Sequence, residues 1–265
     1  FIILTGLMHD RRFSLLRRIL SALVAVPHSA IAIGLVFLLA PSGWLMRIIS
    51  PDITGFDSPP DWRLFPDPDG WALIFGLMAK EIPFLLMISL AAMATLPVRQ
   101  IEQIANSLGY GRVAGWTTLI LPLVYRQIRL PVFAVLVFSL SVVDMALLLA
   151  PTLPPPLAII VLNGFLDADL AARLPASFGA ILQIAIAVMG ICIWHAGEVM
   201  CRHNMSSWRR CGWRPGKIDR YLPMFSIMAV IPLAAACAGL AAACLWSVAG
   251  SWFFPSALPQ NFHLI

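Results

Sequence analysis

Charged residues are scarce in this chain, and their scarcity excludes most classes of soluble protein. Only 12% of the 265 residues are Asp, Glu, Lys or Arg, whereas 60% are hydrophobic. A soluble domain usually has about twice that charged fraction and has too little interior to bury so much apolar surface. The composition therefore predicts an integral membrane protein that is surrounded by membrane lipid.

The sequence also lacks the usual signatures of an enzyme or a metal site. It contains no Gly-x-Ser-x-Gly or His-Glu-x-x-His motif, and its five cysteines do not have the spacing of zinc ligands. The glycines of 212–216 stand one residue too close for a phosphate-binding loop, and Ile218 occupies the position where such a loop needs Ser or Thr for magnesium. We therefore expect no catalytic residue, metal or cofactor in this chain.

Five windows of the sequence are long and apolar enough to cross a bilayer. A bilayer core of about 30 Å needs roughly 20 apolar residues in a helix, and unbroken apolar runs are not typical of membrane β-strands. The windows are 19–40, 71–96, 131–150, 174–196 and 222–249. The sequence thus predicts an all-α membrane protein, a multi-span helical bundle. We interpret the apolar run 1–8 as the tail of a further helix and the chain as a piece of a longer polypeptide.

Basic and acidic loops alternate between the predicted spans. Arg and Lys dominate residues 9–18, 97–130 and 197–221, whereas the loop 41–70 contains five aspartates. Because Lys and Arg are enriched in cytoplasmic loops, the basic loops are predicted to be cytoplasmic and the acidic ones external. This distribution also accounts for the net charge of +5, so no nucleic-acid partner is predicted.

The cytoplasmic loop 97–122 has the most informative pattern. Apolar residues at positions 98, 101, 104, 105 and 108 recur at helical spacing, which predicts a short amphipathic helix. Gly109 stands where a helix commonly ends in a left-handed residue, and Pro122 is expected to break the chain before the next span. Such a helix suits the groove of a partner protein, and lying on the membrane surface is the alternative.

This loop resembles the cytoplasmic signature of binding-protein-dependent ABC transporter permeases, which is Glu-Ala-Ala, three residues, Gly, nine residues, Ile, any residue, Leu-Pro. The corresponding positions here are Gln103, Ile104, Ala105, Gly109, Leu119, Leu121 and Pro122. The spacing matches throughout, four of the seven residues are identical, and Gln103 replaces the acid. The resemblance covers most of the chain and implies a helical bundle of the ABC importer permease type in the bacterial cytoplasmic (inner) membrane.

The resemblance also implies a function, partners and a division of the chain. The chain is expected to form the substrate pathway of an importer. A separate ATP-binding cassette ATPase would bind ATP and magnesium and couple to loop 97–122, and a periplasmic or external substrate-binding protein would contact the aspartate-rich loop and residues 151–156. Residues 1–198 would be a first permease unit, 199–221 a basic cytoplasmic linker and 222–265 the start of a second, fused permease unit.

Three charged residues fall inside predicted spans: Lys80, Glu81 and Asp144. A charge at the bilayer centre costs from about 3 to above 10 kcal/mol, so it faces protein or water. These residues are therefore candidates for the translocation pathway, and pairing with neighbouring helices is the alternative. An ion-coupled secondary transporter that uses these three residues is the main alternative function, ahead of a non-transporting scaffold and a membrane enzyme.

Overall fold

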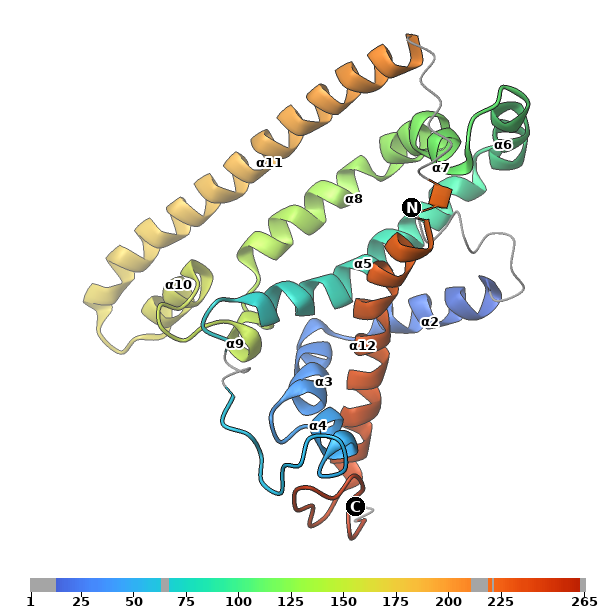
Figure 1. The fold of residues 1–265 in the computed structure, drawn as a ribbon. Helices are drawn as coiled ribbons and strands as arrows, with labels where there is room; N and C mark the ends of the chain where they lie inside the picture. Colours follow the sequence, from blue (N-terminus) through green and yellow to red (C-terminus); the bar gives the residue numbers. More distant parts are fainter. Residues whose placement is uncertain (1–12, 63–66, 211–218, 221, 263–265) are drawn as a thin grey trace. The chain divides into compact units, whose positions relative to one another are not determined.

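The computed structural model describes residues 13–62, 67–210, 219–220 and 222–262. These residues form long helices joined by short helices and turns (Figure 1), as an all-α membrane protein should. In chain order they are α2 (Phe13–Ala25), α3 (His28–Leu39), α4 (Trp44–Ile49), α5 (Trp71–Ala94), α6 (Val98–Ser107), α7 (Arg112–Gly115), the π-helix η1 (Trp116–Ile120), α8 (Leu121–Ser141), α9 (Ala146–Leu149), α10 (Leu157–Leu166), the 3-10 helix η2 (Leu170–Ala172), α11 (Arg173–Arg210) and α12 (Leu222–Val248). The apolar run 1–8 lies outside the described residues.

Within the described residues, five helical segments are long and apolar enough to cross a membrane. They are His28–Ile49, Trp71–Ala94, Arg112–Ser141, Leu170–Ser207 and Val230–Val248. Each overlaps one of the five predicted windows, so the prediction of five spans is confirmed. The bounds of two windows, 19–40 and 131–150, were wrong.

The predicted span 19–40 is interrupted at Pro27. Helix α2 ends at Ala25 and α3 begins at His28. Proline has no N–H to donate to the carbonyl of Leu23, four residues earlier, and it disfavours helical geometry in the residue before it. The crossing segment therefore starts at His28, directly after Pro27, and continues through α4 to Ile49.

The predicted span 131–150 begins earlier and ends earlier than expected. Helical structure runs from Arg112 through η1 into α8 and stops at Ser141. Pro122 does not break this helix: in the wider π turn before it, the N–H of Leu121 bonds to the carbonyl of Trp116, five residues back. The chain bends after Ser141, and Asp144 lies exposed in the turn before α9.

Helix α11 extends well beyond a bilayer core. Its 38 residues span about 57 Å at the usual helical rise, against a core of about 30 Å. The helix continues without interruption from the predicted first permease unit through Arg210, so the first part of the segment 199–221 is helical. Residues 211–218 and 221 lie outside the described residues.

The chain divides into two compact units. Unit 1 consists of Phe1–Ala22, Glu81–Ser141 and Ile181–Ile231, and unit 2 consists of Leu23–Lys80, Val142–Ala180 and Pro232–Ile265. In unit 1, α8 and α11 pack closely beside Gly190, where an added Cβ would lie 2.8 Å from a methyl carbon of Leu140. Gln183 also donates its amide to the carbonyl of Leu140 at 2.7 Å.

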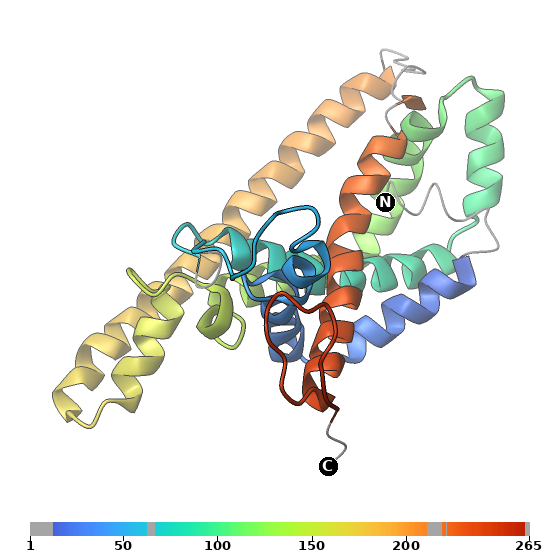
Figure 2. The same cartoon turned by 60° about the horizontal axis from the view of Figure 1, so that its bottom comes forward.

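Unit 2 is held together by contacts of α12 with α3 and α4, which lie side by side in Figure 2. Gly34 meets Gly239 so closely that an added Cβ at Gly34 would lie 2.7 Å from the backbone of Gly239. Further along, Phe37 stacks on Trp246 with ring centroids 4.9 Å apart. The buried guanidinium of Arg47 lies over the same indole and donates to the carbonyl of Ser42. These contacts place the residues at the start of the predicted second permease unit in the core of unit 2.

Candidate functional site

The loop 97–122 folds as the predicted short helix with a left-handed end. Helix α6 occupies Val98–Ser107, and Gly109 has φ of +76°. The N–H of Gly109 bonds to the carbonyl of Asn106, and the N–H of Tyr110 bonds to the carbonyl of Ala105, each at 3.0 Å. This pair of bonds is the Schellman motif, which satisfies the last carbonyls of a helix and favours glycine at the left-handed position. The predicted role of Gly109 as the turn residue is therefore supported by its geometry.

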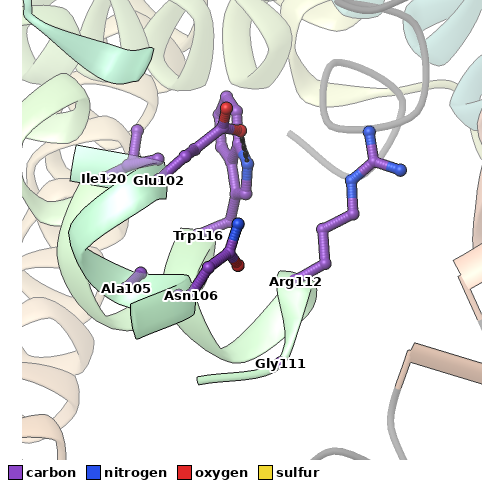
Figure 3. A pocket seen from close by; sticks show the side chains of 8 residues that line it. Glu102, Ala105, Asn106, Gly111, Arg112, Trp116 and Ile120 are labelled. Atoms are coloured by element: carbon purple, nitrogen blue, oxygen red, sulfur yellow. Dashed lines mark hydrogen bonds between the residues drawn. The ribbon is translucent and has the colours of Figure 1, made fainter. Parts of the chain in front are cut away.

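Two contacts hold α6 against the helix that follows it. Ala105 is buried, and its Cβ lies 3.1 Å from where a Cβ on Gly115 would be, so the two backbones approach closely. The indole N–H of Trp116 donates to a carboxylate oxygen of Glu102 at 2.6 Å, the dashed line in Figure 3. Both residues line a pocket of about 310 Å³. The family signature places its acid at position 103; here the acid at position 102 fixes α6 to the π turn.

The outer face of α6 exposes two large apolar side chains. Ile104 is 57% exposed and Leu108 is 49% exposed, and their i,i+4 spacing places them next to each other. We call this pair the apolar ridge. Gln103 is exposed beside it, whereas Val98 and Ala105 are buried. The predicted apolar stripe is thus split: part packs inside unit 1, and the ridge remains on the surface.

The last signature residues lie away from the ridge. Leu119 belongs to η1, and Leu121 and Pro122 begin α8; all three are half-buried. They lie where the loop continues into the spanning helix, and their predicted part in coupling stays a prediction.

An acid from a distant part of the sequence caps the spanning helix. One oxygen of the Asp219 carboxylate accepts the N–H of Arg112 at 2.7 Å, and the other accepts the N–H of Val113 at 2.8 Å. These are the first two residues of α7, where helix N–H groups have no partner within the helix. Asp219 belongs to the basic segment 199–221, so this segment supplies a cap for a helix within loop 97–122.

A second acid joins α8 to α11. Glu198 is 7% exposed in its side chain and forms an ion pair with Arg129 at 2.9 Å. It also accepts the hydroxyl of Tyr125, to which Trp194 donates its indole N–H at 2.8 Å, and it contacts His195 at 3.0 Å. Tyr125 and Arg129 share a helix face by i,i+4 spacing. This polar cluster fixes α8, the continuation of the loop, to the longest helix in the described structure.

The three charged candidates for the translocation pathway have different surroundings. Lys80 is buried, and its ammonium donates to the carbonyls of Leu23 and Val24 at 3.1 and 3.0 Å. Glu81 is half-buried on α5. Asp144, expected to be buried within a span, is exposed in a turn; that expectation was wrong because α8 ends at Ser141.

Among the residues that the structure describes, no three His, Cys, Asp or Glu side chains gather as metal ligands. The residues that the sequence analysis missed are Asp219, Glu198 and the partners of Glu198 on α8. One signal was available, because Glu198 and Asp219 are the two acids in the otherwise basic segment 197–221.

The five candidate spans and the alternation of loop charges define the class: a multi-pass α-helical membrane protein. The chain is similar to the inner membrane ABC transporter permease protein YnjC of Escherichia coli (strain K12), with 30% identity over 229 residues that cover 80% of this chain and 41% of that protein. The resemblance to ABC transporter permeases is thereby confirmed, and the chain is homologous to part of such a permease. It spans less than half of the length of that relative. No protein-family model and no solved structure matches the chain.

Proposed function

We propose that this chain is the pathway-forming permease subunit of an ABC importer and that a separate ATPase couples to it through loop 97–122. The observation that carries the proposal is the apolar ridge of Ile104 and Leu108, exposed on a helix that is fixed to the rest of unit 1. The loop is basic and therefore cytoplasmic by the positive-inside rule. Apolar side chains paired on a cytoplasmic helix gain free energy when a partner covers them.

The contacts around loop 97–122 connect it to the spanning helices, and a movement of the ATPase reaches these helices through them. When the ATPase closes on ATP and magnesium, it moves α6, which Ala105 and Glu102 join to the helix that starts at Arg112. The cluster around Glu198 passes this movement from α8 to α11. The energy enters as a difference between the contacts that the ATPase makes in its two states, as coupling between sites requires. ATP hydrolysis then belongs to the partner, and this chain has no catalytic role of its own.

Import requires a supply of substrate on the external side. In this proposal a substrate-binding protein docks on the aspartate-rich loop and on the proline-rich stretch 151–156, where Leu153 is 86% exposed. The division into a permease unit 1–198, a linker 199–221 and the start of a second unit at 222–265 belongs to the same proposal. The lipid bilayer covers the long apolar faces, including much of α11.

Cysteine labelling at the apolar ridge tests the proposal. Ile104→Cys is introduced into the full-length permease without its native cysteines, and inside-out vesicles are treated with a membrane-impermeant maleimide. We expect rapid labelling, and protection from labelling when the purified cassette ATPase encoded nearest the permease is added with ATP. Ile53→Cys, in the loop predicted to be external and 78% exposed, is the matched control and should label only from the opposite side.

Each result separates the proposal from an alternative. A helix that lies on the membrane surface would leave Ile104→Cys unreactive with and without the ATPase. A secondary transporter would give a reactive cysteine that the ATPase does not protect. Either result would contradict coupling through this loop.

A further inference from the structure

We propose that Asp219 is a positioning residue that holds loop 97–122 in the conformation that the partner ATPase recognises. This inference rests on the proposed function and assigns a role to the segment 199–221, which sequence alone describes as a linker. According to this proposal, the segment between the two predicted permease units helps to hold the coupling site in its conformation.

The helix that begins at Arg112 needs a cap from another part of the chain. Its N-cap residue is Gly111, which has extended backbone geometry and no side chain that could accept an N–H. The first N–H groups of a helix have no partner within the helix, and they carry the positive end of its dipole. A carboxylate at this end is therefore favourable both as a hydrogen-bond acceptor and as a negative charge.

Asp219 meets this need with both oxygens. Its carboxylate accepts the N–H groups of Arg112 and Val113 at 2.7 and 2.8 Å, although it is 107 positions from the first of these residues in the sequence. Charge-assisted bonds of this type are stronger than neutral ones. The contact fixes the start of the helix two residues after the Schellman turn at Gly109.

The cap acts on the same structure that presents the apolar ridge. Gly111 and Arg112 line the pocket of about 310 Å³ together with Glu102 and Ala105, the two residues that hold α6 in place (Figure 3). If the helix start frays, the pocket wall changes, and the contacts that orient α6 weaken. We therefore expect the loss of Asp219 to disturb the ridge without removing any residue from it.

Hydrogen exchange on the full-length permease in nanodiscs reads the positioning directly, with no ATPase present. In Asp219→Ala, we expect the Arg112 and Val113 amides to lose protection roughly fivefold, as the loss of a typical N-cap would produce. Asp219→Asn should restore part of the protection, since its amide oxygen has the same reach and can accept one of the two N–H groups. Arg220→Ala, a change at the exposed neighbouring residue, is the matched control and should leave exchange unchanged. Equal exchange in Asp219→Ala and the unaltered protein would overturn the inference.

Affinity for the ATPase tests the functional part. The cassette ATPase encoded nearest the permease should bind Asp219→Ala several-fold more weakly than the unaltered permease or Arg220→Ala, and Asp219→Asn should lie in between. Equal affinity for Asp219→Ala and Arg220→Ala, with the unaltered permease binding well, would also overturn the inference. If the unaltered permease does not bind, the proposed function fails, and the exchange result alone decides whether Asp219 positions the loop.

Discussion

Gly109 shows how one residue determines the direction of the loop. With φ of +76° it occupies the left-handed region, in which most L-residues are strained, and it lets two backbone bonds close the end of α6. The turn orients the apolar ridge relative to the helix that starts at Arg112. Gly109 thus determines the conformation of loop 97–122, and this role does not require a contact with a partner.

Replacement of Gly109 should reduce coupling according to the conformational preference of the new residue. We expect Gly109→Val to cost about 1–2 kcal/mol in the turn and to lower the affinity for the ATPase about tenfold. Gly109→Asn should retain most of the affinity because asparagine tolerates the left-handed region. The measurement is ATPase binding to purified permease at equal membrane insertion. Equal affinities for the valine and asparagine variants would contradict this role of the turn.

The carboxylate of Asp67 contacts the backbone at the start of α5. The N–H of Ala72 donates to its carboxylate at 2.8 Å, and this bond holds the pKa of Asp67 below its ordinary value. A carboxyl group with a lowered pKa in the folded state stabilises the fold fully above its ordinary pKa of about 3.9, and the stabilisation is lost as the pH falls through the lower folded value.

The ordering of the first turn of α5 should follow this titration. We expect protection of the Ala72 amide, corrected for the intrinsic exchange rate, to stay constant above about pH 5 and to fall below about pH 4. Asp67→Asn cannot ionise and should show no such decrease. A decrease of equal size in Asp67→Asn would assign the effect to another group.

At the scale of elements, the break between α2 and α3 depends on a lysine from α5. Pro27 leaves the carbonyl of Leu23 without its helical donor, and Lys80 donates to this carbonyl and to that of Val24. All of these residues belong to unit 2. A buried ammonium bonded to the carbonyls at the end of a helix has a structural role that does not require a substrate.

Substitution of Lys80 should therefore reduce stability in the absence of any transport. We expect Lys80→Met to destabilise unit 2 by about 2 kcal/mol or more, since buried carbonyls would lose their donor. Thermal unfolding of the permease in nanodiscs measures the effect, and Asp144→Asn, a change at an exposed position, is the control. If Lys80→Met unfolds at the same temperature as the unaltered protein, the lysine is not a structural cap.

The helices and the loop pattern followed from the sequence because both depend on local periodicity. Apolar windows identified the five spans, and the spacing up to Gly109 predicted α6 and its left-handed end. Two of the errors concern prolines, and the third is the end of α8 at Ser141, which leaves Asp144 in a turn. Pro27 interrupts a window that looked continuous, whereas Pro122 is accommodated by a π turn that no local signal indicates.

Contacts between distant parts of the sequence were beyond local patterns. Asp219 caps a helix 107 positions earlier, and Glu198 pairs with Arg129 across two helices. Nothing in the periodicity near these residues specifies their partners; only their isolation in a basic segment marked them. Ile104 and Leu108 were predicted as part of an apolar stripe, and the structure was needed to show that these two remain exposed.

At the scale of the whole molecule, a chain of contacts connects the candidate site with the long helices. Helix α6 with its apolar ridge is joined to the candidate spanning helix that starts at Arg112, and the ion pair between Arg129 and Glu198 connects that helix to α11. The homology to an ABC transporter permease gives this arrangement its context. In the proposed function, the partner ATPase acts on the helical bundle at the apolar ridge.

The most direct test measures the affinity of the cassette ATPase for a permease without its ridge. Burial of the exposed parts of Ile104 and Leu108 contributes about 1 kcal/mol each, so the double variant Ile104→Ser/Leu108→Ser should bind the ATPase about 30-fold more weakly. The control Ile53→Ser/Leu153→Ser removes two apolar side chains from exposed positions elsewhere and should bind normally. Normal binding by the ridge variant would contradict the claim that this loop receives the ATPase.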